Sequence, residues 1–300
     1  MSYQRHNIAN MKGYTWGEQP DDTDTIKLNT NENPYPPSPA VADAFAKIDV
    51  EALRTYPPPT ADALRDMLAD KHRVRRDNLV MTHGGDEGLR LAFTTFVEPG
   101  AAFGMTEPSY SLYPVLANIH GATIHTTALD HDWQLPRDFA SRLNEAGANL
   151  ACLVNPHAPS GTLLDAEKVG QIANEFRGVL LVDEAYVDFV DPALHHDLVR
   201  LIHVFDNLLI LRTFSKGYSL AGLRLGYLLG AESLIAPLLT KTRDSYNIDL
   251  ISQRLGMAAL SDQAYVENTW AAVRQERRTL RDELLQRGNK DKPQKFRVDF

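Results

Sequence analysis

The sequence has little cysteine, no long hydrophobic run and no cluster of positive charge. Its 300 residues include one cysteine, Cys152, which excludes an internal disulfide and any metal site built from several cysteines and is typical of a reducing compartment. The apolar runs GVLLV at 178–182 and LLILR at 208–212 are far shorter than the roughly 20 residues that cross a bilayer. Residues 1–22 lack the apolar core of a secretory signal. We therefore expect a cytoplasmic protein that does not enter a membrane.

The charge of the chain is acidic overall, and its basic residues are scattered. A formal net charge of −8 without a basic patch argues against a nucleic-acid surface and favours a small-molecule partner. The segment GVLLVDEA at 178–185 is similar to the strand and acidic pair that hold magnesium in ATPases. However, the chain has no G-x-x-x-x-G-K-[ST] loop, which excludes a nucleotide hydrolase. We expect no metal site.

Short apolar runs alternate with helical patterns along the chain. Continuous apolar runs predict strands that are buried on both faces, and they occur at 78–82, 149–154, 178–182 and 207–212. Helical patterns occur at 40–48, 61–72, 86–97, 109–119, 136–146 and 165–176. Pro114 counts against an ideal helix at 109–119. The alternation predicts an α/β fold with a mostly parallel central sheet flanked by helices.

The two ends of the chain depart from this alternation. Four prolines between 34 and 39 predict an extended N-terminal arm over 1–39, before a large α/β domain over 40–258. Near the other end, apolar residues at helical spacing predict a long helix that closes at Gly288. KFRVDF at 295–300 is typical of the beginning of a strand. We expect residues 259–300 to form a linking helix and the start of a smaller, incomplete second domain.

Polar or glycine-rich turns follow all four predicted strands. HGGDEG, the first of them, contains Gly84 and Gly85, which free the backbone before a helix N-terminus that can bind an anion. The other turns are NPHAPSG at 155–161, DEAY at 183–186 and TFSKGYSLAGLR at 213–224. Because ligands bind beyond the carboxyl ends of parallel strands, we expect these turns to form one site.

The residue types in these turns are those that a pyridoxal phosphate site requires. This cofactor needs a lysine amine for a Schiff base, a carboxylate against its pyridine nitrogen and donors for its phosphate. Lys216 and Asp183 supply the amine and the carboxylate. The hydroxyls of Thr213 and Ser215 and the guanidinium of Arg224 supply donors for the phosphate.

The motifs also carry a family resemblance. In their order, GGDEG, EPSYSLYP, NPHAPSG, DEAYVDF and RTFSKGYSLAGLRLGY resemble the fold-type I pyridoxal phosphate aminotransferases. Together with LNTNENPYPPSP and SYNID, the chain looks most like the histidinol-phosphate aminotransferase branch, from about residue 28 to its end. The resemblance implies a homodimer with shared active sites. It also implies transfer of an amino group between histidinol phosphate, or a similar amine or amino acid, and 2-oxoglutarate.

The resemblance assigns roles to the motif residues. Lys216 forms the Schiff base and moves the proton between substrate and cofactor. Asp183 pairs with the pyridinium, Tyr186 hydrogen-bonds the phenolate oxygen, and Tyr110 stacks on the ring. Tyr56 reaches the cofactor phosphate of the partner subunit.

Further residues are assigned to binding. The resemblance implies that Gly84 contacts the cofactor, and that its phosphate is bound by the backbone amides of Gly85 and Asp86 and the side chains of Thr213, Ser215 and Arg224. The residues that line the substrate pocket, or simply build a turn, are Asn31, Glu32 and Asn33.

Two positions depart from the family pattern. Ala158 stands where the family has the asparagine that contacts the phenolate oxygen, so we expect Asn155 or His157 to take that contact. Gly85 stands where the family has a hydroxyl residue, which leaves its backbone amide as the donor. The arginines that bind the carboxylate or phosphate of the substrate are expected beyond Phe300.

The cofactor residues alone leave other functions open. An amino acid aminotransferase of different specificity and a phosphothreonine-type decarboxylase share them, because both are fold-type I enzymes. A protein that binds the cofactor without turnover shares them as well. Substrate tests separate these alternatives.

Overall fold

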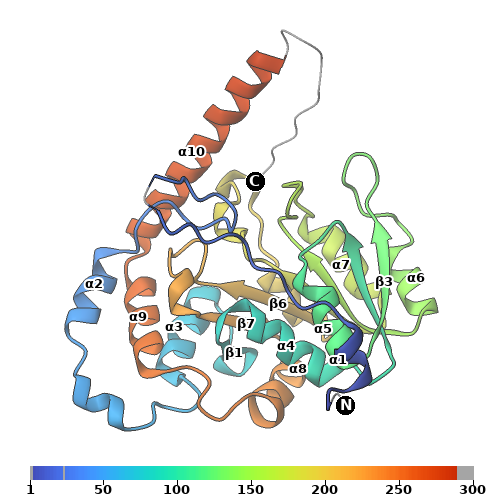
Figure 1. Cartoon of the computed structure of the whole chain (residues 1–300), viewed down its shortest axis with the longest axis horizontal. Coiled ribbons are helices and arrows are strands. Elements are labelled where there is room, and N and C mark those ends of the chain that lie inside the picture. Colours follow the sequence, from blue (N-terminus) through green and yellow to red (C-terminus); the bar gives the residue numbers. More distant parts are fainter. Residues whose placement is uncertain (1–2, 23, 289–300) are drawn as a thin grey trace.

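A seven-stranded sheet lies at the centre of the computed structural model, which describes residues 3–22 and 24–288 (Figure 1). The strands are β1 (Leu79–Thr82), β2 (Ala102–Glu107), β3 (Thr123–Ala128), β4 (Ala148–Val154), β5 (Val179–Asp183), β6 (Leu208–Thr213) and β7 (Gly226–Gly230), in the spatial order β1-β7-β6-β5-β4-β2-β3. β7 runs antiparallel to both of its neighbours, and the remaining pairs are parallel. The predicted α/β fold with a mostly parallel sheet is confirmed. Consequently β1, β4, β5 and β6 all end at the same edge of the sheet.

The four predicted strands are β1, β4, β5 and β6, and the structure adds three that the sequence analysis did not predict. β3, TIHTTA, lies at the edge of the sheet and is mostly exposed, so it has no continuous apolar run. β7, GYLLG, is short and has a glycine at each end. Only a residue without a side chain fits at Gly226, because a Cβ atom there would lie 2.9 Å from the carbonyl carbon of Gly84.

Helices cover both faces of the sheet. They are α1 (His6–Asn10), α2 (Pro39–Ala46), α3 (Asp62–His72), α4 (Gly84–Phe96), α5 (Leu112–His120), α6 (Phe139–Glu145), α7 (Ala166–Glu175), α8 (Glu232–Pro237), α9 (Leu250–Ser261) and α10 (Gln263–Gly288). The short helical turns are η1 (Val50–Arg54), η2 (Arg76–Asn78), η3 (Val187–Phe189), η4 (Pro192–Leu194), η5 (Val199–His203), η6 (Ala221–Leu223) and η7 (Leu238–Thr242). All the predicted helices are present, and α1, α8 and α9 were not predicted.

Pro114 explains why α5 begins later than the sequence pattern indicates. The helix starts at Leu112 instead of residue 109, which places Pro114 in its first turn. The missing N–H of a proline costs little there, because the first amides of a helix have no partner within it. The proline therefore sets the beginning of α5 and does not interrupt it.

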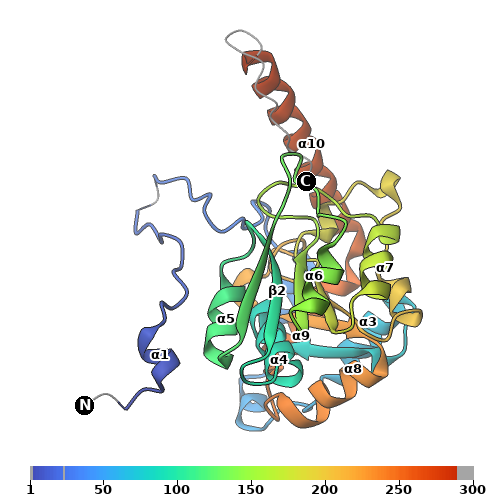
Figure 2. The same ribbon diagram turned by 90° about the vertical axis from the view of Figure 1, so that its right-hand side faces the viewer.

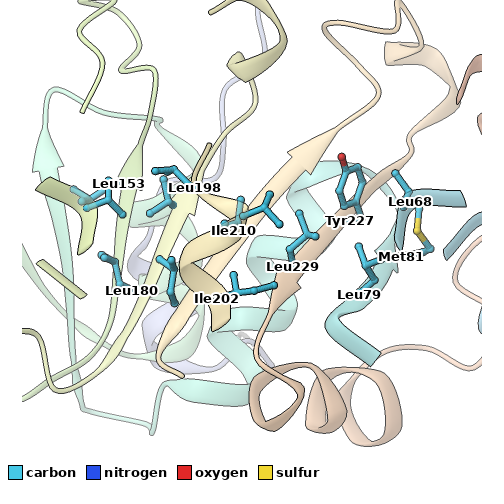
Figure 3. Packing of buried hydrophobic residues seen from close by; sticks show 14 of the residues in the cluster. Leu68, Leu79, Met81, Leu153, Leu180, Leu198, Ile202, Ile210, Tyr227 and Leu229 are labelled. Atoms are coloured by element: carbon cyan, nitrogen blue, oxygen red, sulfur yellow. The ribbon is translucent and has the colours of Figure 1, made fainter. Parts of the chain in front are cut away.

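Two apolar clusters fill the space between the sheet and its helices. Along β6, Leu208 and Ile210 belong to one cluster, whereas Leu209 and Leu211 belong to the other. Side chains alternate between the faces of a strand, so this pattern shows that the sheet is buried on both faces. The first cluster includes residues of α3, α6, α7 and α9 and is seen in Figure 3; the second includes residues of α4, α5 and α8.

The arm before α2 and the later turns of α10 lie outside this layered body. Residues before α2 form no strand within the described ranges, and they run along one side of the body as an arm (Figure 2). α10 projects beyond the sheet, and α9 continues through residue 258 to Ser261 (Figures 1 and 2). The strand expected at 295–300 lies outside the described residues. Among the helices of 3–22 and 24–288, none combines the length and apolarity needed to cross a membrane.

Candidate active site

Lys216 lies in the turn after β6, at the edge of the sheet where β5 ends in Asp183. Burial lowers the pKa of the Lys216 amine, and nearby charges act on it as well, those of Glu32, Arg224, Asp183 and Asp86. The ammonium form of a buried lysine is disfavoured because burial removes it from water. The structure thus brings an amine, a carboxylate and a guanidinium together at one edge of the sheet.

The N-terminal arm covers the Lys216 turn. The Lys216 Nζ atom donates a hydrogen bond of 2.6 Å to the Thr30 carbonyl. The Asn33 amide donates to the Lys216 carbonyl at 3.1 Å, and the Asn31 amide donates to the Tyr186 hydroxyl at 2.9 Å. The arm segment predicted to line a substrate pocket therefore contacts both the lysine and the phenol.

Glu32 and Tyr186 complete the surroundings of the amine. The Glu32 carboxylate forms an ion pair of 2.7 Å with Lys27, which holds the pKa of that carboxyl below its usual range. The Lys216 Nζ atom lies 5.8 Å from the ring centre of Tyr186, a distance compatible with a cation–π contact. Burial raises the pKa of the Tyr186 phenol, so it stays protonated at neutral pH.

Asp183 is buried at the end of β5, with 4% of its surface exposed. The Tyr113 hydroxyl donates to its Oδ2 atom at 2.8 Å, and the Ala185 amide donates to its Oδ1 atom at 3.1 Å. Burial raises the pKa of the Asp183 carboxyl to about 6, so the group is still ionised at neutral pH. The sequence analysis did not identify Tyr113. The one sequence feature that could have pointed to Tyr113 is its position three residues after Tyr110 in the motif EPSYSLYP.

The start of α4 and the side chain of Arg224 form a corner that can bind an anion, called the anion corner below. Gly84 has φ +74°, and a Cβ atom at this position would lie 2.7 Å from the Arg224 Nη2 atom. The same Nη2 atom donates to the Asp86 carboxylate at 3.0 Å. The first amides of α4, including that of Gly85, have no partner within the helix and can bind an anion.

Buried hydroxyls and an open cleft border this corner. Thr213 and Ser215 are buried, their side-chain oxygens lie 2.9 Å apart, and the Ser215 amide donates to the Thr213 hydroxyl at 3.0 Å. A cleft of about 490 Å³ is lined by His83, Asp86, Glu87, Arg90, Arg224, Asp244 and Asn247. The Arg224 guanidinium and the first amides of α4 can therefore bind a small dianion of the size of a phosphate.

Tyr110 lies between this corner and Asp183. Its hydroxyl donates to the Asp86 carboxylate at 3.3 Å, and its ring meets the Tyr113 ring edge-on, with the centres 5.6 Å apart. The ring of Tyr14, from the arm, also lies edge-on to it at 6.1 Å. Tyr110 is thus an aromatic group at the site, in contact with residues beside both the carboxylate and the anion corner.

Asn155 and His157 bind other parts of the protein. The Asn155 side chain exchanges hydrogen bonds with the backbone of Leu164, at 3.0 Å and 2.8 Å. The two ring nitrogens of His157 lie 2.7 Å from the Ser160 hydroxyl and 2.9 Å from the Pro108 carbonyl. Both side chains therefore stabilise the NPHAPSG turn, and contact of either with a cofactor stays a prediction.

Tyr56 lies on the surface, with 80% of its area exposed. Its ring stacks on that of Tyr246, with the centres 4.4 Å apart and the planes 20° from parallel. Its side chain is thus accessible to another molecule.

A buried ion pair next to Asp183 was not predicted. The Glu184 carboxylate accepts hydrogen bonds from Arg212 Nε at 2.8 Å and lies 2.7 Å from its Nη2 atom, and the His196 ring is 3.1 Å away. Glu184 is 1% exposed, and the Arg212 charge keeps its carboxyl ionised despite burial. The pair ties the end of β5 to the end of β6. No cluster of three or more His, Cys, Asp or Glu side chains that could hold a metal occurs in residues 3–22 and 24–288.

Comparisons with known proteins agree with this geometry. The family described as aminotransferase class I and II matches residues 23–293. A histidinol-phosphate aminotransferase of Geotalea daltonii is 38% identical over 281 residues, which cover 93% of this chain and 78% of that protein. The enzyme of the same name from Citrifermentans bemidjiense is 39% identical over 288 residues, covering 95% of this chain and 79% of the relative. A crystal structure of histidinol-phosphate aminotransferase from Sinorhizobium meliloti, in complex with pyridoxal-5'-phosphate, superposes with a TM-score of 0.78 at 26% identity, covering 84% of this chain and 68% of that chain.

Proposed function

Because this chain belongs to the class I and II aminotransferases, we propose that it transfers the amino group of histidinol phosphate to 2-oxoglutarate with pyridoxal 5'-phosphate as its cofactor. The observation that carries this proposal is the meeting of Lys216, Asp183 and Arg224 at one edge of the sheet. Relatives at 38% and 39% identity that are named for histidinol phosphate support the choice of substrate.

The residues present fit the cofactor. At Gly84 the backbone approaches the Arg224 guanidinium so closely that no side chain fits between them. This approach places helix amides and a guanidinium around one point, as a phosphate dianion requires. Among the described residues, the Asp183 carboxylate accepts hydrogen bonds only from the Tyr113 hydroxyl and the Ala185 amide. A carboxylate oxygen has more than one acceptor position, so Asp183 can also accept the N–H of a protonated pyridine ring.

The roles of the protein groups follow from their surroundings. Pyridoxal phosphate, when bound, supplies an electron-withdrawing ring that takes up the electron pair of the broken C–H bond. Lys216 would take the proton from the α-carbon of the substrate and deliver it to the C4′ carbon of the cofactor, and the pKa-lowering effect of burial favours the neutral amine that can accept it. Asp183 remains ionised and holds the ring N–H. Tyr186, fixed by Asn31, hydrogen-bonds the phenolate oxygen.

The remaining assignments concern assembly and the substrate. A homodimer places the exposed Tyr56 of each subunit at the cofactor phosphate of the other. Asn31, Glu32 and Asn33 line the substrate pocket, and their contacts with the Lys216 turn and with Lys27 support this assignment. Residues 40–258 form the cofactor-binding domain. The cytoplasmic location stays a prediction.

The test is a transamination assay with matched variants. The purified protein, loaded with pyridoxal phosphate, is given histidinol phosphate and 2-oxoglutarate, and glutamate is measured. We expect steady glutamate formation, and we expect Lys216→Ala to lose it by several orders of magnitude, because the variant lacks the amine that we propose moves the proton. Lys47→Ala changes an exposed lysine at the end of α2 and should keep the activity.

The outcome with other donors separates the alternatives. Glutamate formed faster from a different amino acid would assign that amino acid as the donor. Release of carbon dioxide from O-phosphothreonine would indicate the decarboxylase instead. Turnover of Lys216→Ala at a near-normal rate would refute the role of this lysine.

A further inference from the structure

Tyr113 is the one side chain that donates a hydrogen bond to Asp183 within the described residues. It belongs to α5, has 0% of its surface exposed, and packs in the apolar cluster on the α4 and α5 side of the sheet. Its hydroxyl is therefore a polar group at the end of an otherwise apolar ring. A buried hydroxyl without a partner is costly, so the bond of 2.8 Å to Asp183 Oδ2 fixes both groups.

Burial and two neighbouring acidic groups make the Asp183 carboxyl more basic. Burial raises its pKa first, and the acidic groups of Asp86 and Glu184 act in the same direction. The hydrogen bonds from Tyr113 and from the Ala185 amide lower it. Titratable groups that face Asp183 from the neighbouring elements are Tyr113, Asp86, Glu184, Cys152, Tyr186 and Lys216. Within this set, only the Tyr113 hydroxyl donates directly to the carboxylate.

We propose that Tyr113 is a positioning residue for the amino transfer, whose hydroxyl holds the Asp183 carboxylate in place and weakens it as a base. A proton that lies between a carboxylate and a ring nitrogen moves toward the stronger base. By weakening the carboxylate, Tyr113 leaves this proton on the ring nitrogen, and a protonated ring withdraws electrons more strongly. The inference rests on the proposed function, since it requires that the cofactor ring meets Asp183.

The first test uses the protein without cofactor. Aspartate carboxyl carbons are labelled with carbon-13, and the Asp183 resonance is identified by its absence in Asp183→Asn. In Tyr113→Phe the ring keeps its packing but loses the donor, and we expect the titration midpoint of Asp183 to rise by about one pH unit. Tyr227→Phe is the matched control, because Tyr227 is also buried and its hydroxyl lies 2.9 Å from the His72 ring. It should leave the Asp183 midpoint unchanged.

The second test uses the loaded enzyme with nitrogen-15 in the cofactor ring. In Tyr113→Phe the ring-nitrogen resonance should move toward that of a neutral pyridine, and kcat should fall about tenfold with little change in KM. A loss of packing alone would not move this resonance.

The two tests can contradict the role of Tyr113 without contradicting the proposed function. An Asp183 midpoint that is the same in Tyr113→Phe and the wild type overturns the role of Tyr113, whether or not the cofactor binds. An unchanged ring-nitrogen resonance in the loaded variant overturns it too. If instead the wild type forms no glutamate, the proposed function fails while the carboxyl titration still reports on Tyr113.

Discussion

At the scale of single residues, the anion corner depends on a backbone that has no side chain at Gly84. The residue adopts a left-handed conformation, φ +74°, and the space that a Cβ atom would take holds the Arg224 guanidinium. Two separate reasons thus favour glycine here, the backbone angle and the close approach. The two reasons can be separated experimentally, because Gly100 also has a positive φ angle but has no atom close to the position of a Cβ.

Gly84→Ala should weaken pyridoxal phosphate binding about tenfold or more, because the new methyl group displaces the guanidinium that we propose binds the phosphate. Gly100→Ala is the control: Gly100 has φ +84°, but a methyl group added there would meet no atom within 4 Å. Both variants should lose about 1 kcal/mol of folding stability from the backbone angle. The measurement is the dissociation constant of pyridoxal phosphate for each variant, from fluorescence titration of the cofactor-free protein. Equal affinities of the two variants would disprove the role of the close approach.

Some residues of the site could be predicted from the sequence, and others could not. Lys216 and Asp183 could be found because each follows an apolar run and belongs to a recognisable motif. Tyr113 could not, because its partner Asp183 is 70 positions away and nothing in EPSYSLYP indicates which way the second tyrosine points. The pairing of Glu184 with Arg212 was missed for the same reason.

At the scale of elements, the site depends on strand ends that are held at a fixed spacing. β5 and β6 are adjacent and parallel, and the buried pair of Glu184 and Arg212 joins them just where Asp183 and the Lys216 turn emerge. A buried charge that loses its partner is strongly destabilising. The pair therefore stabilises the fold next to the groups that we propose to be catalytic.

Glu184→Gln should lower the free energy of unfolding by about 3–5 kcal/mol, because the buried Arg212 charge would lose the carboxylate that is hydrogen-bonded to it. Glu232→Gln, which breaks the exposed pair with Arg75, should cost only about 0–1 kcal/mol. Urea unfolding of the cofactor-free variants measures both values. Similar losses in the two variants would show that burial of the first pair does not matter.

Elements differ in how well sequence pattern predicts them. β4, β5 and β6 lie in the interior of the sheet, so they are apolar on both faces and their runs are continuous. β3 is an edge strand with polar residues, and β7 is short and glycine-bounded, so neither produces such a run. The prediction thus succeeded for β1 and β4 and for the strands that lead to Asp183 and Lys216, and it failed for β2, for the edge strand β3 and for the reversed strand β7.

At the scale of the whole molecule, parts that are far apart in sequence meet at one edge of the sheet. The arm contributes Asn31 and Asn33, α4 contributes Gly84, the end of β5 contributes Asp183, and the turn after β6 contributes Lys216. Parallel strands make this possible, because their carboxyl ends lie together while their helices pack on the faces. The arm was the hardest part to predict, because its sequence has no periodicity that would indicate contacts with the Lys216 turn.

The central claim is that Lys216 is the amine that holds the cofactor, and reduction with borohydride tests it most directly. The protein is incubated with pyridoxal phosphate, reduced and digested, and the peptides are analysed by mass spectrometry. We expect one phosphopyridoxyl group per chain, on the peptide that contains Lys216, and no such group in Lys216→Ala. A label on a different lysine, or an unlabelled Lys216 in protein that has bound the cofactor, would contradict it.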